Sequence, residues 1–220
     1  MGRPRQVTDE QILSATRRVV LEHGAQISLD VVAQEVGVTS PALLKRYGTR
    51  HALLIAALRP DDAEFARLFE VPPDDRPFAE QLESMLDGLS KYFNKTFPCM
   101  MALRECGIPR EELEQTIKLP PIVTGIRAMT RWLGLMSKRG LIETEAHESA
   151  ATAIIGAVST RTISRHLAKL QASTRSQREH QQELAEMFAR ALGAKTPQPP
   201  KKEPRRRPAK ARPRTRTAQS

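Results

Sequence analysis

The sequence predicts an all-α protein, because three kinds of helix signal recur along it. Apolar residues return at spacings of three and four through most of residues 8–192, as they do on one face of a helix. Thr and Ser stand where helices would begin, and Gly or Pro stands where the apolar periodicity stops. Gly is scarce in the central region, whereas Ala and Leu are abundant. A chain of 220 residues can form one compact domain or two small ones.

The first helix is predicted to begin at a capping box. Thr8 and Gln11 have the spacing at which each side chain bonds the other residue's backbone N–H. The helix is expected to end at Gly24. Its apolar face is formed by Ile12, Ala15, Thr16, Val19, Val20 and His23.

Two short helices joined by a Gly-containing turn are predicted within residues 28–50. Gly37 stands where the first of them needs a left-handed C-cap, and Thr39 is a good N-cap for the second. Pro41 is tolerated in the first turn of that second helix. This is the geometry of a helix-turn-helix, whose second helix lies in the DNA major groove. The apolar face of the first helix is formed by Leu29, Val32, Ala33 and Val36.

The charge pattern supports DNA binding independently of the turn. No Asp or Glu occurs between Glu35 and Asp61. Carboxylates are unfavourable on a surface that faces phosphates, so an acid-free window suits a DNA interface. The alternative is a solvated helix face that happens to lack acids. The basic residues of the window are Lys45, Arg46, Arg50 and Arg59.

A fourth helix is expected after Thr49, ending near Pro60, and completes a small unit over residues 8–60. The acidic, Pro-rich residues 61–77 are predicted to be a connector. A second domain is expected over residues 75–193. Its predicted helices cover residues 77–95, 97–106, 111–117, 122–138, 144–171 and 178–192.

The penultimate helix is apolar nearly all round between Ala150 and Val158, which is typical of a helix buried on more than one side. The small residues Ala153, Gly156 and Ala157 would let another helix approach closely. We therefore expect a homodimer formed through residues 144–192. The alternative is that these helices only close the core of one chain.

The net charge of +10 belongs almost entirely to the C-terminal tail. Residues 195–220 hold ten of the 35 Lys and Arg but one of the 25 Asp and Glu, so the tail carries +9 and the rest of the chain +1. The tail has no aromatic residue and is rich in Pro. Such a composition predicts a disordered basic tail over residues 194–220.

The segment AQEVGVTSPALLKRYGTRHALLIAAL, at residues 33–58, resembles the TetR family of bacterial transcriptional regulators. The order of the helices and the long C-terminal helices are similar to that family as well. The resemblance implies an N-terminal three-helix helix-turn-helix domain that binds DNA, and a C-terminal helical bundle for effector binding and dimerisation. It also implies a homodimer on a palindromic operator, and a repressor released when an unknown small-molecule effector enters the bundle.

The resemblance extends to individual DNA-binding positions. Ser28 matches a phosphate contact at a helix start, and Arg50 stands where the family usually has a phosphate-contacting Lys. Leu44 replaces the usual Tyr, which removes one hydroxyl contact, and Tyr47 replaces the usual Phe. The candidate DNA-binding residues are Arg3, Arg5, Ser28, Thr39, Ser40, Pro41, Ala42, Lys45, Arg46, Tyr47 and Arg50.

The side-chain types fit these roles. Lys45 and Arg46 can donate to guanine O6 and N7 or to phosphates, and Ala42 can pack on a thymine methyl group. Arg3 and Arg5 precede the first helix and can reach phosphates or an adjacent minor groove.

An apolar effector pocket is expected between helices of the second domain. Trp132 is its best single candidate, although each proposed residue can equally belong to the core. A hydrophobic or aromatic effector would suit such a pocket. The candidate ligand-binding residues are Met85, Leu89, Phe93, Met100, Met101, Trp132 and Met136.

Other function classes lack support in the sequence. The five His residues show no metal-site spacing, and no P-loop, GxGxxG or GxSxG motif occurs, so neither an enzyme nor a cofactor is expected. Cys99 and Cys106 are predicted to be buried apolar residues. No membrane span and no secretory signal are apparent, so we expect a cytoplasmic, nucleoid-associated bacterial protein.

An architectural DNA-binding protein that uses its basic tail without an effector is the alternative function. Deleting residues 195–220 would separate the two functions. A regulator should keep its operator specificity, whereas an architectural protein should lose nearly all DNA binding.

Overall fold

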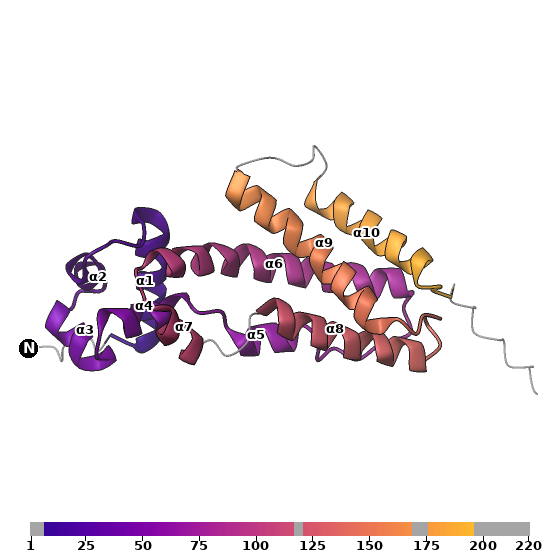
Figure 1. Cartoon of the computed structure of the whole chain (residues 1–220), viewed down its shortest axis with the longest axis horizontal. Helices are drawn as coiled ribbons and strands as arrows, with labels where there is room; N and C mark the ends of the chain where they lie inside the picture. Colours follow the sequence, from indigo (N-terminus) through magenta and orange to yellow (C-terminus); the bar gives the residue numbers. More distant parts are fainter. Residues whose placement is uncertain (1–6, 117–120, 169–175, 196–220) are drawn as a thin grey trace, which may run out of the picture.

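The computed structural model describes residues 7–116, 121–168 and 176–195. These residues form an elongated molecule with helices α1 to α4 at one end and a bundle of longer helices at the other (Figure 1). No strand occurs within the described ranges. The helices are α1 (Asp9–His23), α2 (Leu29–Val36), α3 (Ser40–Tyr47), α4 (Arg50–Leu58), α5 (Asp62–Arg67), α6 (Phe78–Glu105), α7 (Arg110–Thr116), α8 (Pro121–Lys138), α9 (His147–Ala168) and α10 (Gln177–Ala191).

The capping signals near the N-terminus are confirmed. The Gln11 backbone N–H donates to Thr8 Oγ1 at 3.2 Å, and the Thr8 N–H donates to Gln11 Oε1 at 3.0 Å, which completes the predicted capping box. Thr49 caps α4 by accepting from the Ala52 N–H at 3.0 Å. The first three helices share a small core with α4, formed by Ile12, Val32, Ala33, Leu43 and Leu53.

The turn between α2 and α3 is built as the sequence predicts. Gly37 has φ 72° and ψ 34°, a left-handed conformation that costs glycine little. The next N–H, from Val38, donates to Ala33 O at 2.9 Å, which closes the C-terminal end of α2. Thr39 Oγ1 then accepts from the Ala42 N–H and starts α3. Because these caps fix both helix ends, the angle between α2 and α3 is set locally.

The expected connector over residues 61–77 contains a helix, α5, and so is not simply a linker. Asp61 caps α5 by accepting from the N–H groups of Ala63 and Glu64. Phe65 is 1% exposed and belongs to the core of the bundle. Its ring lies so close to Gly125 of α8 that a Cβ at Gly125 would meet it at 2.7 Å. Burial of this aromatic ring therefore outweighs the polar composition of the segment.

The two helices expected over residues 77–95 and 97–106 are one continuous helix, α6. Pro98 lies inside it, where it removes one backbone hydrogen bond. Burial on both sides of the proline holds the helix together, since Phe93 and Cys99 both pack into hydrophobic clusters. α6 consequently runs from the bundle to the N-terminal helices (Figure 1).

The bundle consists of α6, α8, α9 and α10. α9 begins at His147, three residues later than expected, and α10 begins after Ser176, whose side chain forms a second capping box. α10 is tied to α6 by Gln181, whose side-chain amide donates to Ser90 Oγ at 3.0 Å and to Leu86 O at 3.4 Å. Gln181 is buried, so these bonds satisfy a polar group that would otherwise destabilise the core.

The C-terminal end of α6 packs against α1 and α4. Cys99 and Cys106 lie in this cluster as buried free thiols, which confirms the predicted burial. Burial raises the pKa of both thiols, so both stay protonated and unreactive near neutral pH. Two hydrogen bonds reinforce the junction, from Gln26 Nε2 to Glu105 O and from Arg17 Nε to Ala57 O.

The chain leaves the bundle at Lys195, whose N–H donates to Leu141 O at 3.1 Å. From position 196 onward, the predicted disordered tail lies outside the described residues. The alternative function, an architectural protein that binds DNA through this tail, therefore stays a prediction. None of the described helices combines the length and apolar character that a bilayer crossing requires.

Candidate DNA-binding surface and effector cavity

The outer face of α3 presents short side chains and one lysine. Leu43 is 1% exposed and anchors the helix, while Thr39, Pro41, Ala42 and Lys45 are exposed around it. Within the described residues, Lys45 has no ion pair or hydrogen-bond partner. The side chains on this face are small enough for the helix to approach base edges, and the lysine is available to a phosphate or a guanine.

Arg46 points away from this face toward the start of α1. Its Nε lies 2.7 Å from Asp9 Oδ1, and its Nη1 donates to Val7 O at 2.7 Å. The Tyr47 hydroxyl donates to the same Asp9 oxygen at 2.8 Å. Burial and then this hydrogen bond raise the pKa of Tyr47 to about 12, so the hydroxyl remains a donor at neutral pH. Both side chains therefore hold α1 and α3 together.

Arg50, the predicted phosphate contact, is hydrogen-bonded inside the fold in the absence of DNA. Its Nη2 donates to Ala25 O at 2.7 Å and to Ile27 O at 3.1 Å, and its Nε donates to Ile27 O at 3.3 Å. The half-buried guanidinium thus ties α4 to the segment between α1 and α2. In this structure Arg50 positions the helix-turn-helix.

The remaining candidate residues lie at helix starts or outside the described part of the chain. Ser28 Oγ caps α2 by accepting from the Val31 N–H at 3.4 Å. The Ser40 hydroxyl donates to the Asp30 carboxylate across the turn. Leu44 is 40% exposed on α3. Arg3 and Arg5 precede the first described residue.

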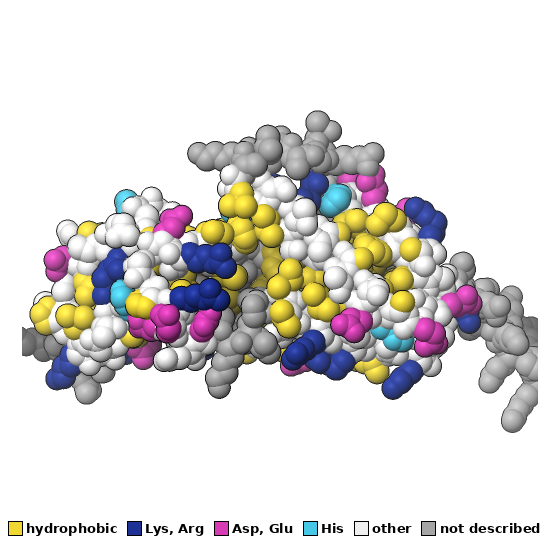
Figure 2. Space-filling model, in the orientation of Figure 1, with side chains coloured by type: hydrophobic (Ala, Val, Ile, Leu, Met, Phe, Trp, Pro, Cys, Tyr) yellow, Lys and Arg dark blue, Asp and Glu magenta, His cyan; other side chains and the backbone are white. Residues whose placement is uncertain are grey.

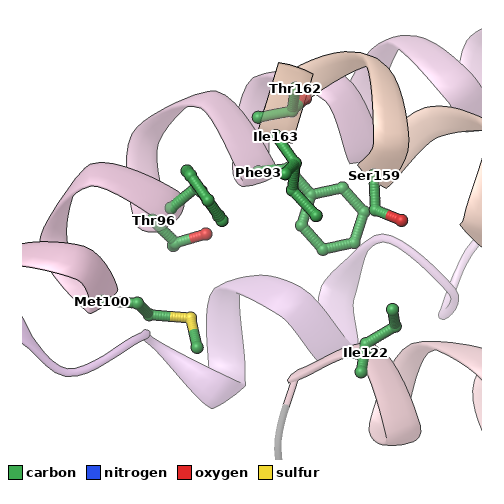
Figure 3. A pocket seen from close by; sticks show the side chains of 8 residues that line it. Phe93, Thr96, Met100, Ile122, Ser159, Thr162 and Ile163 are labelled. Atoms are coloured by element: carbon green, nitrogen blue, oxygen red, sulfur yellow. The ribbon is translucent and has the colours of Figure 1, made fainter. Parts of the chain in front are cut away.

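An apolar cavity of about 160 Å³ lies between α6, α8 and α9. Figure 3 shows Phe93, Thr96 and Met100 of α6 on one side, Ser159, Thr162 and Ile163 of α9 on another, and Ile122 of α8 on a third. The three hydroxyl groups of the lining each donate to a carbonyl of their own helix. Their hydrogen atoms are thus already used, so the cavity favours an apolar ligand.

The predicted pocket residues divide into two groups. Phe93 and Met100 line the cavity, whereas Met101 is half-buried and does not. Trp132, the best single candidate, is 3% exposed and packs on Phe78 with ring centroids 5.9 Å apart. Trp132 belongs to the core because it lies on the side of α8 that packs against the start of α6. The other predicted residues in the core are Met85, Leu89 and Met136.

Several lining residues were missed although a sequence signal for them exists. Phe93, Thr96, Phe97 and Met100 follow the spacing of a single helix face. These residues share one face only in a continuous α6, whereas the sequence predicted a break at residue 96. On α9 the corresponding residues are Ser159, Thr162 and Ile163.

No protein-family model matches the chain, and no curated protein matches its sequence. Solved structures do match. A TetR-family regulator, PfmR from Thermus thermophilus, is 18% identical with a TM-score of 0.57, over 84% of this chain and all of that one. A tetR-family protein from Rhodococcus RHA1 is 15% identical with a TM-score of 0.59, over 87% of this chain and all of that one. The chain has a TetR-type fold.

A third match agrees with this result. A putative TetR-family regulator from Mesorhizobium loti MAFF303099 is 14% identical with a TM-score of 0.62, over 84% of this chain and 96% of that one. The TetR-type fold therefore covers both the N-terminal helices and the bundle. In the described residues, no group of three His, Cys, Asp or Glu side chains is placed to hold a metal ion.

Proposed function

We propose that this protein is a sequence-specific DNA-binding transcriptional regulator, with repression as its output and a small-molecule effector as its signal. The observation that carries the proposal is the α2–turn–α3 geometry. Both helices are capped, Gly37 sets the turn, and α3 presents a small-residue face with Lys45 exposed. A short rigid helix with such a face suits the major groove.

The direct test is a gel-shift titration with a duplex that the wild-type protein enriches from random DNA. Replacing Lys45 and Arg46 together by Ala should abolish specific binding, because Lys45 is the exposed cation on the outer face of α3 and Arg46 holds α3 on α1. Unchanged affinity of this double variant for the enriched duplex would rule out α3 as the recognition helix.

Dimerisation through residues 144–192 would place two recognition helices on one palindromic operator. Ala153 is exposed on α9, and the space outside Gly156 is open. Leu167 is 64% exposed and Met187 is 46% exposed. Figure 2 shows hydrophobic side chains over this part of the bundle. Small and apolar exposed groups on two long helices support an interface between copies of the chain.

Replacing Ala153 by Arg is expected to give a monomer, because a long charged side chain would stand between the paired helices. Sedimentation velocity at micromolar concentration measures this directly. Operator affinity should fall by about 100-fold or more, since each monomer then binds one half-site alone. Ser84→Arg, at an exposed position of α6, is the matched control and should leave the mass unchanged. A dimeric Ala153→Arg variant would place the interface elsewhere.

The cavity between α6, α8 and α9 is the proposed effector site. Its volume of about 160 Å³ suits a group the size of one aromatic ring. Thr96 borders this cavity and also a smaller one at the junction with the N-terminal helices, beside Arg17 and Cys99. A ligand that displaces this part of α6 would therefore act directly on the packing of α1 and α4.

Toluene is a suitable first probe of the cavity. At ten times its Kd, a ligand that binds only the folded state stabilises it by about 1.4 kcal/mol, which a thermal melt detects. Met100→Trp should abolish this stabilisation, because the indole would fill the space. Leu135→Trp, at an exposed position outside the cavity, should not. Equal toluene effects in both variants would show that the probe binds elsewhere.

A further inference from the structure

Two carboxylates from other helices flank the recognition helix α3. At its start, Asp30 of α2 accepts a hydrogen bond from Ser40. At its end, Asp9 of α1 accepts from Arg46 Nε at 2.7 Å and from the Tyr47 hydroxyl at 2.8 Å. The sequence has no acid from residue 36 to residue 60, so α3 itself contributes none. The fold therefore places one negative charge beside each end of α3, whose own sequence has none.

These contacts contribute little to stability. The Asp9 side chain is 63% exposed, and Asp30 is exposed as well. Solvent screens exposed ion pairs, and their measured contributions are small. An asparagine at either position has the same shape and can accept the same hydrogen bonds. Each charge also lies in the first turn of its own helix, where it stabilises the helix dipole by about 0.3–1 kcal/mol. Its position beside α3 has a separate effect on DNA.

A carboxylate beside α3 responds differently to different DNA surfaces. Its negative charge repels phosphates. A carboxylate can only accept hydrogen bonds, so it also cannot bond to guanine O6 and N7 or to thymine O4, which are acceptors themselves. It is favoured only where a base presents an amino donor, as cytosine N4 and adenine N6 do in the major groove. A protein lying loosely along the phosphate backbone meets the repulsion without such a compensating donor.

We propose that Asp9 and Asp30 are specificity determinants, which weaken binding to non-operator DNA more than binding to the operator. The proposal rests on the proposed DNA-binding function. Asp9 has a second effect, because it holds the Arg46 guanidinium on α1 and so withholds one cation from indiscriminate phosphate contacts. The protein would then prefer its operator partly because Asp9 and Asp30 weaken its binding to other DNA sequences.

The test uses the full-length variants Asp9→Asn, Asp30→Asn and the double variant. The matched control is Glu10→Gln, an isosteric loss of the same charge in the first turn of α1, where Glu10 lines the groove between α1 and α2. Fluorescence anisotropy gives Kd for a random-sequence duplex and for the duplex enriched by the wild type. Thermal melts check that each variant folds.

Each single variant is expected to bind the random duplex about threefold more tightly, the effect of one unit charge ~7 Å from a phosphate in water. Operator affinity should rise less, so the ratio of the two affinities should fall. Glu10→Gln should change that ratio by less than half as much. An unchanged ratio in the double variant, or equal changes in the control, would overturn the proposal while leaving the proposed function intact. If the wild type enriches no sequence, the proposed function fails first and this proposal falls with it.

Discussion

Lys45→Ala is expected to weaken operator binding by about 1–3 kcal/mol, which corresponds to about 5- to 150-fold. Lys45 is exposed in the last turn of α3 and has no partner among the described residues. Its ammonium group is thus available to a guanine or a phosphate without breaking a contact inside the protein. Because no internal contact is lost, the thermal midpoint should stay that of the wild type.

The two roles of Lys45 are separable by measurement. If it reads a base, Lys45→Ala should also relax selectivity at one position of each half-site; if it contacts a phosphate, affinity should fall equally for all sequences. Lys91→Ala, on the exposed face of α6, is the control and should leave operator binding unchanged. Wild-type operator affinity in Lys45→Ala would contradict the placement of α3 in the groove.

Arg50→Ala is expected to lower the free energy of unfolding by about 2 kcal/mol, because charge-assisted hydrogen bonds to two main-chain carbonyls are lost. Arg50 bonds Ala25 O and Ile27 O, and Ala25 is buried. The segment that positions α2 would loosen, so operator affinity should fall together with stability. Urea unfolding of the purified variant measures the loss.

Arg59→Ala is the matched control for Arg50→Ala, since it removes the same charge from the end of the same helix. Arg59 is exposed, and its side chain makes no hydrogen bond or ion pair among the described residues. The free energy of unfolding of the Arg59→Ala variant should differ from that of the wild type by no more than about 0.5 kcal/mol. If Arg50→Ala instead weakens DNA binding at unchanged stability, Arg50 contacts a phosphate, as the sequence resemblance predicted.

The caps and the turn were predictable because they are local. Thr8, Gly37, Thr39 and Thr49 act on backbone groups within four residues, so sequence spacing alone determines their partners. α5 was not predictable in this way. Its formation depends on the burial of Phe65 against helices far along the chain, which outweighs a local excess of Asp and Pro.

The candidate DNA-binding side chains also divide into those fixed by local sequence and those fixed by contacts distant in sequence. Sequence spacing indicated which residues lie on the outer face of α3. It did not indicate the partners of Arg46 and Arg50, because Asp9 is 37 residues from Arg46 in sequence and Ala25 is 25 residues from Arg50. A guanidinium group hydrogen-bonds to acceptors that the fold brings close to it. Such acceptors are distant in sequence, so no local sequence pattern predicts them.

In the proposed dimer, the two α3 helices read a symmetric DNA sequence. Selection from a random duplex pool with the full-length protein tests it most directly. We expect enrichment of a palindrome whose half-sites are about one helical turn or slightly more apart, and loss of that enrichment in Lys45→Ala. Binding without enrichment of any sequence, or equal enrichment by the variant, would contradict it.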